Sequence, residues 1–374
     1  MTCDDCSIQG PLEGKGCEFG TSTACTNLDG PNMNIPRPSA RSQFSHRSFS
    51  CAVLTIQLVR ACFIYFVQGY LTCLEVFWMS TTKRVSKAVI PAAGLGTRLL
   101  SATKEQPKEM LPLFASEGGA LCLKPAVQLI FEQLFDLGLR EFCFIVGKGK
   151  RAIEDHFTPD RDYTTRLNEN GRGIQALQLE RFYDRIEAAT IVWLNQPAPR
   201  GFGHAVLEAE PLIGGETFLV QAGDTYITSK SRLIQSRLFQ AHFARNTDVT
   251  LTVQQVTDTR QYGVAQVRES TDGCLEVVSV EEKPTKPKSN LAIMPLYVFI
   301  GSIFESLRKT EKDRKGEIQL TDAIQGLLDS GRNVQAIKLR PDDLRLDIGT
   351  PETYWEALEL SYRNATSESS SIRT

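Results

Sequence analysis

Residues 88–113 read AVIPAAGLGTRLLSATKEQPKEMLPL, and this stretch decides the fold. The apolar residues 88–91 predict a buried strand, and a glycine-rich turn follows that leads to Arg98 and, ten residues later, to Lys108. Backbone amides of such a turn can bind phosphate oxygens, and two cations add positive charge at the same place. A tight turn with a solvent-facing Arg and Lys is the structural alternative.

Two common phosphate-binding loops do not match this turn. A dinucleotide-binding loop needs G-x-G-x-x-G, but Leu99 stands at the position of the third glycine after Gly94 and Gly96. A Walker loop needs G-K-[ST], which is absent from this stretch. The pattern therefore argues against a dinucleotide-binding oxidoreductase and against a P-loop NTPase.

From residue 87 onward, short apolar runs alternate with longer amphipathic segments, which is typical of α/β architecture. We expect a Rossmann-like, mostly parallel central sheet with helices on both faces, and an added mixed sheet after about residue 260. Helices are predicted at residues 124–137, 203–210 and 321–328 and from 351, where Thr350 can cap. Strands are predicted at residues 88–91, 142–146, 190–195, 217–221, 249–253, 263–267, 275–280 and 291–300.

Residues 1–78 differ from the rest of the chain, because they contain seven of its ten cysteines and show no clear periodicity before residue 52. The apolar run 52–78 is interrupted by Arg60, Gln68 and Glu75, and charges near a bilayer centre are costly. We expect an irregular, dispensable extension from a miscalled start, with the natural chain beginning at Met79. A membrane anchor formed by residues 52–78 is the alternative.

The overall charge is balanced, with 42 Lys and Arg against 44 Asp and Glu and a net charge of −2. Nucleic-acid and anionic-membrane binding usually rely on clustered basic residues, so neither partner is expected. Small acidic ligands need only a local group of cations.

Residues 86–363 resemble the sugar-1-phosphate nucleotidyltransferases, whose signature is a strand followed by G-x-G-T-R and then P-K. Further stretches agree in order and spacing, namely RGFGHAVLEAE (200–210), AGDTYI (222–227), YGVAQV (262–267), EEKP (281–284), SNLAI (289–293), GEIQLTDAI (316–324) and LDIGTPE (346–352). The resemblance implies one nucleotidyltransferase domain, in which the added mixed sheet binds sugar, followed by a polar tail at 364–374.

The implied reaction is attack of a sugar-phosphate oxygen on the α-phosphorus of a nucleoside triphosphate, with release of pyrophosphate. Arg98 and Lys108 would hold the triphosphate and stabilise the leaving group, because catalysis here depends on cations and positioning. Asp224 follows a predicted strand and should lie at the carboxyl end of the sheet, where open α/β folds bind ligands. With Asp347, which matches the family's second acidic metal ligand, it would hold Mg²⁺.

The resemblance also assigns substrate contacts. Gln196 would bind the pyrimidine edge, since a glutamine amide both donates and accepts, and His204 is expected to be structural. The implied nucleotide-binding residues are Ala93, Gly94, Gln196 and Gly201, and the implied sugar-phosphate-binding residues are Gly263, Glu282 and Lys283.

The motifs PKEMLPL, GFGHAVL and GEIQLTDAI favour the uridylyltransferase branch, and therefore UTP and glucose-1-phosphate as substrates. The segment LDIGT is nearer to the thymidylyltransferase branch, so dTTP is the alternative nucleotide. A catalytically silent regulatory homologue is a third hypothesis, but it would be expected to lose charged site residues that this chain keeps. We also expect a cytoplasmic homo-oligomer that acts on small molecules.

Overall fold

The computed structural model describes residues 84–371, except 230, 232 and 271–272. The predictions for residues 1–78, including the apolar run 52–78 and the start at Met79, lie outside the described residues. Among the helices that are described, none combines the length and apolar character that a membrane span requires.

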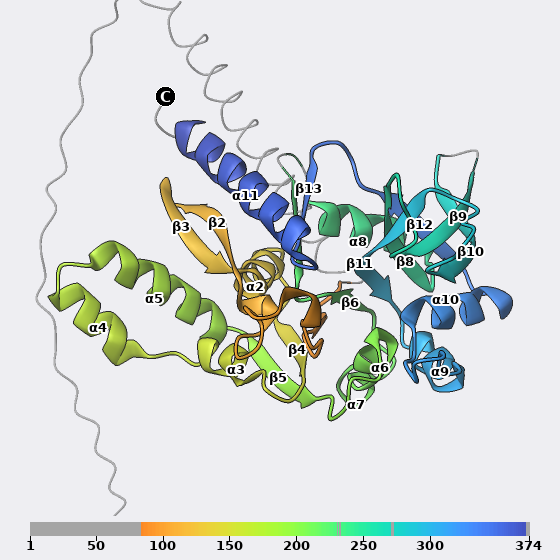
Figure 1. The fold of residues 1–374 in the computed structure, drawn as a ribbon, viewed down its shortest axis with the longest axis horizontal. Coiled ribbons are helices and arrows are strands. Elements are labelled where there is room, and N and C mark those ends of the chain that lie inside the picture. Colours follow the sequence, from red (N-terminus) through yellow and green to blue (C-terminus); the bar gives the residue numbers. More distant parts are fainter. Residues whose placement is uncertain (1–83, 230, 232, 271–272, 372–374) are drawn as a thin grey trace, which may run out of the picture. The chain divides into compact units, whose positions relative to one another are not determined.

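The order of elements confirms the predicted alternation of strands and helices (Figure 1). The strands are β1 (Lys87–Pro91), β2 (Pro112–Glu117), β3 (Ala120–Pro125), β4 (Glu141–Val146), β5 (Thr190–Asn195), β6 (Phe218–Gln221), β7 (Thr225–Ser229), β8 (Val249–Gln255), β9 (Gly263–Glu269), β10 (Leu275–Glu282), β11 (Leu291–Phe299), β12 (Val334–Lys338) and β13 (Asp343–Asp347). The helices are η1 (Thr97–Leu99), η2 (Lys108–Met110), α2 (Ala126–Asp136), α3 (Arg151–His156), α4 (Arg161–Glu169), α5 (Gly173–Glu187), α6 (Phe202–Leu207), α7 (Glu210–Ile213), α8 (Ile234–Arg245), α9 (Ser302–Lys309), α10 (Leu320–Asp329) and α11 (Pro351–Ser371).

A nine-stranded sheet in the order β5-β4-β1-β6-β11-β8-β12-β10-β9 is the largest sheet of the described residues. Strands β5, β4, β1 and β6 pair in parallel, as expected for strands joined by helical crossovers. Strand β11 then pairs antiparallel with both β6 and β8, and the remaining strands make the sheet mixed. The closely spaced strands after residue 260 therefore continue the first sheet.

Both faces of the sheet are buried where β1 lies near the middle of its parallel part. Val89 points into one apolar core with α6, α7, α9 and α10, whereas Ala88 and Ile90 point into another with α2, α3, α5 and α8. Successive strand residues face opposite sides of a sheet, so a continuous apolar run such as Ala88–Ile90 fits a strand covered by helices on both faces. The predicted α/β class with helices on both faces is confirmed.

A third, smaller core joins the hairpin β2–β3, the strand pair β7–β13 and α11. Figure 1 shows β2, β3 and β13 on either side of α11. Its buried residues include Leu113, Leu346 and Ala357. Helix α11 begins as predicted, because the hydroxyl of Thr350 accepts a hydrogen bond from the amide of Thr353 at 3.2 Å. It continues to Ser371, so most of the predicted polar tail is helical.

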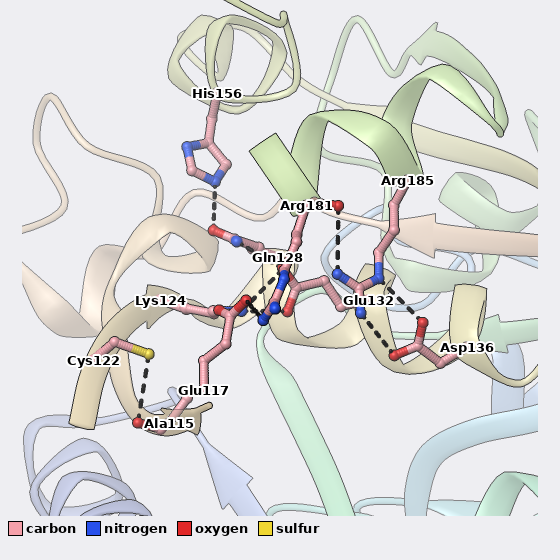
Figure 2. Close-up of polar contacts among 10 residues, drawn as sticks. All are labelled: Ala115, Glu117, Cys122, Lys124, Gln128, Glu132, Asp136, His156, Arg181 and Arg185. Carbon is pink, nitrogen blue, oxygen red and sulfur yellow. Dashed lines mark hydrogen bonds and ion pairs between the residues drawn. The ribbon is translucent and has the colours of Figure 1, made fainter. Parts of the chain in front are cut away.

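A buried ionic network fastens the hairpin to α2 (Figure 2). Lys124 Nζ lies 2.8 Å from Glu117 Oε2 and 2.8 Å from Glu132 Oε2, and Gln128 donates a further hydrogen bond to Glu132. Burial disfavours the charged ammonium, but Glu132 and Glu117 together raise the pKa of Lys124 above its ordinary value. Arg181 on α5 lies 3.6 Å from the other oxygen of Glu117 and extends the network to a second helix.

We predict that Lys124→Met lowers the free energy of unfolding by about 3 kcal/mol, because it leaves the carboxylates of Glu117 and Glu132 buried without their cation. Lys309→Met is the matched control, since Lys309 pairs with Glu305 on an exposed helix surface, where such a pair contributes less than about 1 kcal/mol. Chemical denaturation followed by circular dichroism measures both. Equal stability of the two variants would contradict the role given to Lys124.

Candidate active site

The glycine-rich turn leaves β1 and is held in shape by contacts to its own backbone. Gly96 has φ of 67°, a left-handed conformation that favours glycine, and its carbonyl accepts a hydrogen bond from the Thr103 hydroxyl at 2.8 Å. A Cβ on Gly94 would lie 3.5 Å from Lys108 Cε, so the Lys108 side chain lies directly against the turn. The turn and η2 thereby place backbone amides and an ammonium group side by side.

Lys108 forms an ion pair with Asp224, which follows β6 at the carboxyl end of the parallel strands. Burial opposes ionisation of Asp224, but the Lys108 ammonium holds the pKa of Asp224 below its ordinary value. Burial likewise disfavours the charged lysine, yet Asp224 and Glu109 raise the pKa of Lys108. Both groups are therefore charged at neutral pH.

A second ion pair, between Glu109 and Lys150, holds η2 in place. Glu109 Oε2 accepts a hydrogen bond from Lys150 Nζ at 2.8 Å, and both side chains are almost fully buried. Lys150 is the residue directly before α3, and Gly147 in the same loop lies against the Ala93 carbonyl, so this loop contacts both the glycine turn and η2.

Asp347 ends β13 and lies close enough to Asp224 for the two charges to interact. Burial and the charge of Asp224 raise the pKa of Asp347 above its ordinary value, and Arg345, Lys108 and Arg98 partly offset this effect. Two carboxylates that repel each other in one place form a site that favours a cation.

Gln196 and Gly201 lie at a second part of the site and contact each other. The Gln196 side-chain nitrogen donates to the Gly201 carbonyl at 3.2 Å and lies 3.1 Å from His204 Nδ1. His204 thus fixes the Gln196 amide, which agrees with the structural role expected for it. Gly203 and Arg200 exchange backbone hydrogen bonds with Ile318, so RGFGH and GEIQL form one surface.

Gly263, Glu282 and Lys283 form the third part of the site, at the paired ends of β9 and β10. Glu282 accepts hydrogen bonds from Thr321 at 2.7 Å and from Lys283 Nζ at 2.6 Å. A Cβ on Gly263 would lie 2.7 Å from the Thr321 hydroxyl, so only glycine fits beside this bond. Lys283 has a left-handed φ of 44°, and its amide donates to the Tyr262 carbonyl.

All of the site residues predicted from the sequence line one cavity of about 560 Å³. These residues are Ala93, Gly94, Arg98, Lys108, Gln196, Gly201, Asp224, Gly263, Glu282, Lys283 and Asp347.

Several residues that the sequence analysis missed line the same cavity, among them Glu109, Tyr262, Thr321 and Arg345. Arg345 stands two residues before Asp347 and shares its face of β13, but this strand was not predicted, so the spacing alone gave no signal. Thr321 carried no signal apart from its place within GEIQLTDAI.

The chain matches the family model described as nucleotidyl transferase over residues 87–363. It therefore belongs to the nucleotidyl transferase family, as the resemblance indicated.

Several proteins named for one activity are similar to this chain over about two thirds of its length or more. A Bacillus subtilis UTP–glucose-1-phosphate uridylyltransferase is 39% identical over 249 residues, which are 66% of this chain and 81% of that protein. UTP–glucose-1-phosphate uridylyltransferase 1 of Staphylococcus saprophyticus is also 39% identical over 249 residues, 65% of this chain and 82% of its own. The crystal structure of a UDP-glucose pyrophosphorylase complexed with UDP-glucose superposes with a TM-score of 0.64 at 29% identity, covering 75% of this chain and 100% of the other.

We predict that Gly263→Ala lowers kcat/KM for nucleotidyl transfer at least tenfold, since the added methyl group must displace Thr321 or Glu282. Gly215→Ala is the control, because a Cβ there meets no atom within 4 Å. Steady-state kinetics and thermal unfolding measure both variants. The packing argument fails if Gly263→Ala retains normal kcat/KM, or if its loss is matched by Gly215→Ala.

Proposed function

We propose that the protein catalyses transfer of the uridylyl group from UTP to glucose-1-phosphate, giving UDP-glucose and pyrophosphate. The observation that carries this proposal is the convergence of the glycine turn, Arg98, Lys108, Gln196, Glu282, Lys283 and Asp347 on one cavity. Relatives that are named for this reaction match this chain over 81% and 82% of their own length.

In the proposed mechanism the triphosphate binds along the glycine turn. Arg98 and Lys108 neutralise the triphosphate and stabilise the negative charge that moves onto the leaving pyrophosphate. Because Lys108 is paired with Asp224 in this structure, its ammonium exchanges a carboxylate for phosphate oxygens when the nucleotide binds. A phosphate oxygen of glucose-1-phosphate is the nucleophile, so no covalent enzyme intermediate is needed.

The residues at the carboxyl end of the sheet fit Mg²⁺. Asp224 and Asp347 offer hard oxygen ligands, and burial together with the charge of Asp224 raises the pKa of Asp347. A bound cation would offset this excess of negative charge. Within the described residues no group of three or more His, Cys, Asp or Glu could hold a metal, so phosphate oxygens and waters would complete the coordination. When bound, Mg²⁺ would supply charge neutralisation at the α-phosphate.

Substrate specificity follows from the other two parts of the cavity. The Gln196 amide, held by Gly201 and His204, would pair with the uracil edge, with Ala93 and Gly94 beside the base. Gly263 and Glu282 would receive the glucose hydroxyls, and Lys283 the phosphate of the sugar.

We also place the reaction in the cytoplasm. Among the described residues, Cys122, Cys143 and Cys274 form no disulfide with one another, as expected in a reducing compartment. Assembly as a homo-oligomer stays a prediction. Analytical ultracentrifugation tests it by measuring the molar mass of the protein in solution.

The substrates are tested by measuring pyrophosphate release from UTP, dTTP, CTP, ATP and GTP against glucose-, galactose- and N-acetylglucosamine-1-phosphate, with and without Mg²⁺. We expect UTP with glucose-1-phosphate to be the best pair. A dTTP preference of about tenfold in kcat/KM, equivalent to about 1.4 kcal/mol, would assign the thymidylyl reaction instead. Absence of turnover with every pair would favour the catalytically silent homologue.

We predict that Asp224→Asn and Asp347→Asn each lower kcat about a hundredfold or more, on the order of 3 kcal/mol, because each removes one carboxylate of the cation site. Asp258→Asn is the control, since Asp258 pairs with Arg260 on the surface. Mg²⁺ titrations of turnover, with circular dichroism to check folding, distinguish the variants. Near-normal turnover of either site variant would remove that residue from the cation site.

A further inference from the structure

Arg345 lies in the cavity at a position that the proposed mechanism leaves unused. It stands in the middle of β13, whose alternation directs Leu346 into the third core and leaves Arg345 and Asp347 on the same face, lining the cavity. Its side chain is only 17% exposed, so its charge is largely removed from water. A buried cation of this kind needs an anionic partner.

The protein satisfies the Arg345 guanidinium only in part. Its Nη1 donates to Asp347 Oδ2 at 3.4 Å, a long contact, and its Cζ lies 5.7 Å from the centre of the Tyr262 ring. A guanidinium carries five N–H donors, so one long hydrogen bond among the described residues leaves most of them for a ligand. A purely structural Arg–Asp pair would be expected to be shorter and bidentate.

The two contacts of Arg345, with Asp347 and Tyr262, place it between the proposed cation site and the proposed sugar-phosphate site. Asp347 belongs to the proposed cation site, where the α-phosphate must lie. Tyr262 precedes Gly263 and accepts the backbone hydrogen bond of Lys283, so it belongs to the proposed sugar-phosphate site. The phosphate of the sugar substrate must lie between these two places, since one of its oxygens attacks the α-phosphorus.

We propose that Arg345 binds the phosphate group of the sugar 1-phosphate and orients the attacking oxygen, an inference that rests on the proposed function. As the new bond from that oxygen to the α-phosphorus forms, the bond from the α-phosphorus to the bridging oxygen of the β-phosphate breaks, and pyrophosphate leaves with the electron pair. Arg345 stays protonated throughout and gives up no proton.

Lys283 alone is poorly placed to hold this phosphate. Its Nζ is paired with Glu282 at 2.6 Å, and its side chain is 54% exposed. Arg345 is more buried, and a guanidinium can bind two phosphate oxygens at once, which fixes the direction of the third.

The test compares Arg345→Gln and Arg345→Lys with the wild-type protein, varying glucose-1-phosphate at saturating UTP and then UTP at saturating glucose-1-phosphate. We expect Arg345→Gln to raise KM for glucose-1-phosphate at least tenfold and to lower kcat, while KM for UTP changes less than threefold. Arg345→Lys should recover part of the loss, because it keeps the charge but not the paired donors. Arg268→Gln, which changes an exposed Arg paired with Glu276, should alter neither KM.

The proposal would be overturned if Arg345→Gln raised KM for glucose-1-phosphate and KM for UTP equally. It would also be overturned if the variant changed only the Mg²⁺ concentration that gives the half-maximal rate. Either result would show that Arg345 acts through Asp347. Thermal unfolding is measured for each variant, and if Arg345→Gln does not fold, the KM values of Arg345→Lys decide. Failure of the proposed function is seen separately, as absence of wild-type turnover with UTP and glucose-1-phosphate. In that case the same comparison is made with the sugar phosphate that the substrate matrix identifies.

Discussion

Asp224 and Asp347 place two negative charges in one largely buried cavity, and Lys108 neutralises the first of them by direct contact. These three charges come from different parts of the chain: Asp224 follows β6, Asp347 ends β13, and Lys108 lies in η2 against the glycine turn. Their attraction and repulsion therefore connect these elements. The buried pair of Glu109 and Lys150 links η2 to the loop that precedes α3. In the proposed mechanism, an incoming cation and triphosphate replace the ionic contact of Lys108 with Asp224.

The fold could be predicted where hydrophobic periodicity was strong. Strands β1, β4, β5 and β6 were recognisable as short apolar runs, since they are covered by helices on both faces. The hairpin β2–β3 was missed because each of its strands has only one fully buried residue, Leu113 in β2 and Lys124 in β3. Its ionic link through Lys124 to α2 is a tertiary interaction without a local signal. The β13 strand was missed for a similar reason, since four of its five residues are charged or partly exposed.

The candidate site was predictable as a set of residues but not as a set of contacts. Motif resemblance identified positions such as Gln196 and Glu282, which prove to line one cavity. It could not show that His204 holds Gln196 or that Thr321 holds Glu282, because these hydrogen bonds join segments that meet only in the folded chain. Arg345 was overlooked because a single Arg in a loop-like segment gives no chemical signal until its strand neighbours are known.

The central claim is that Lys108 leaves Asp224 when the substrates bind, so that a metal ion takes its place. A crystal structure with Mg²⁺ and a non-hydrolysable UTP analogue tests this most directly. The account predicts that Lys108 Nζ contacts phosphate oxygens and that Asp224 and Asp347 both ligate the metal. A complex in which Lys108 remains paired with Asp224, with the metal held elsewhere, would contradict it.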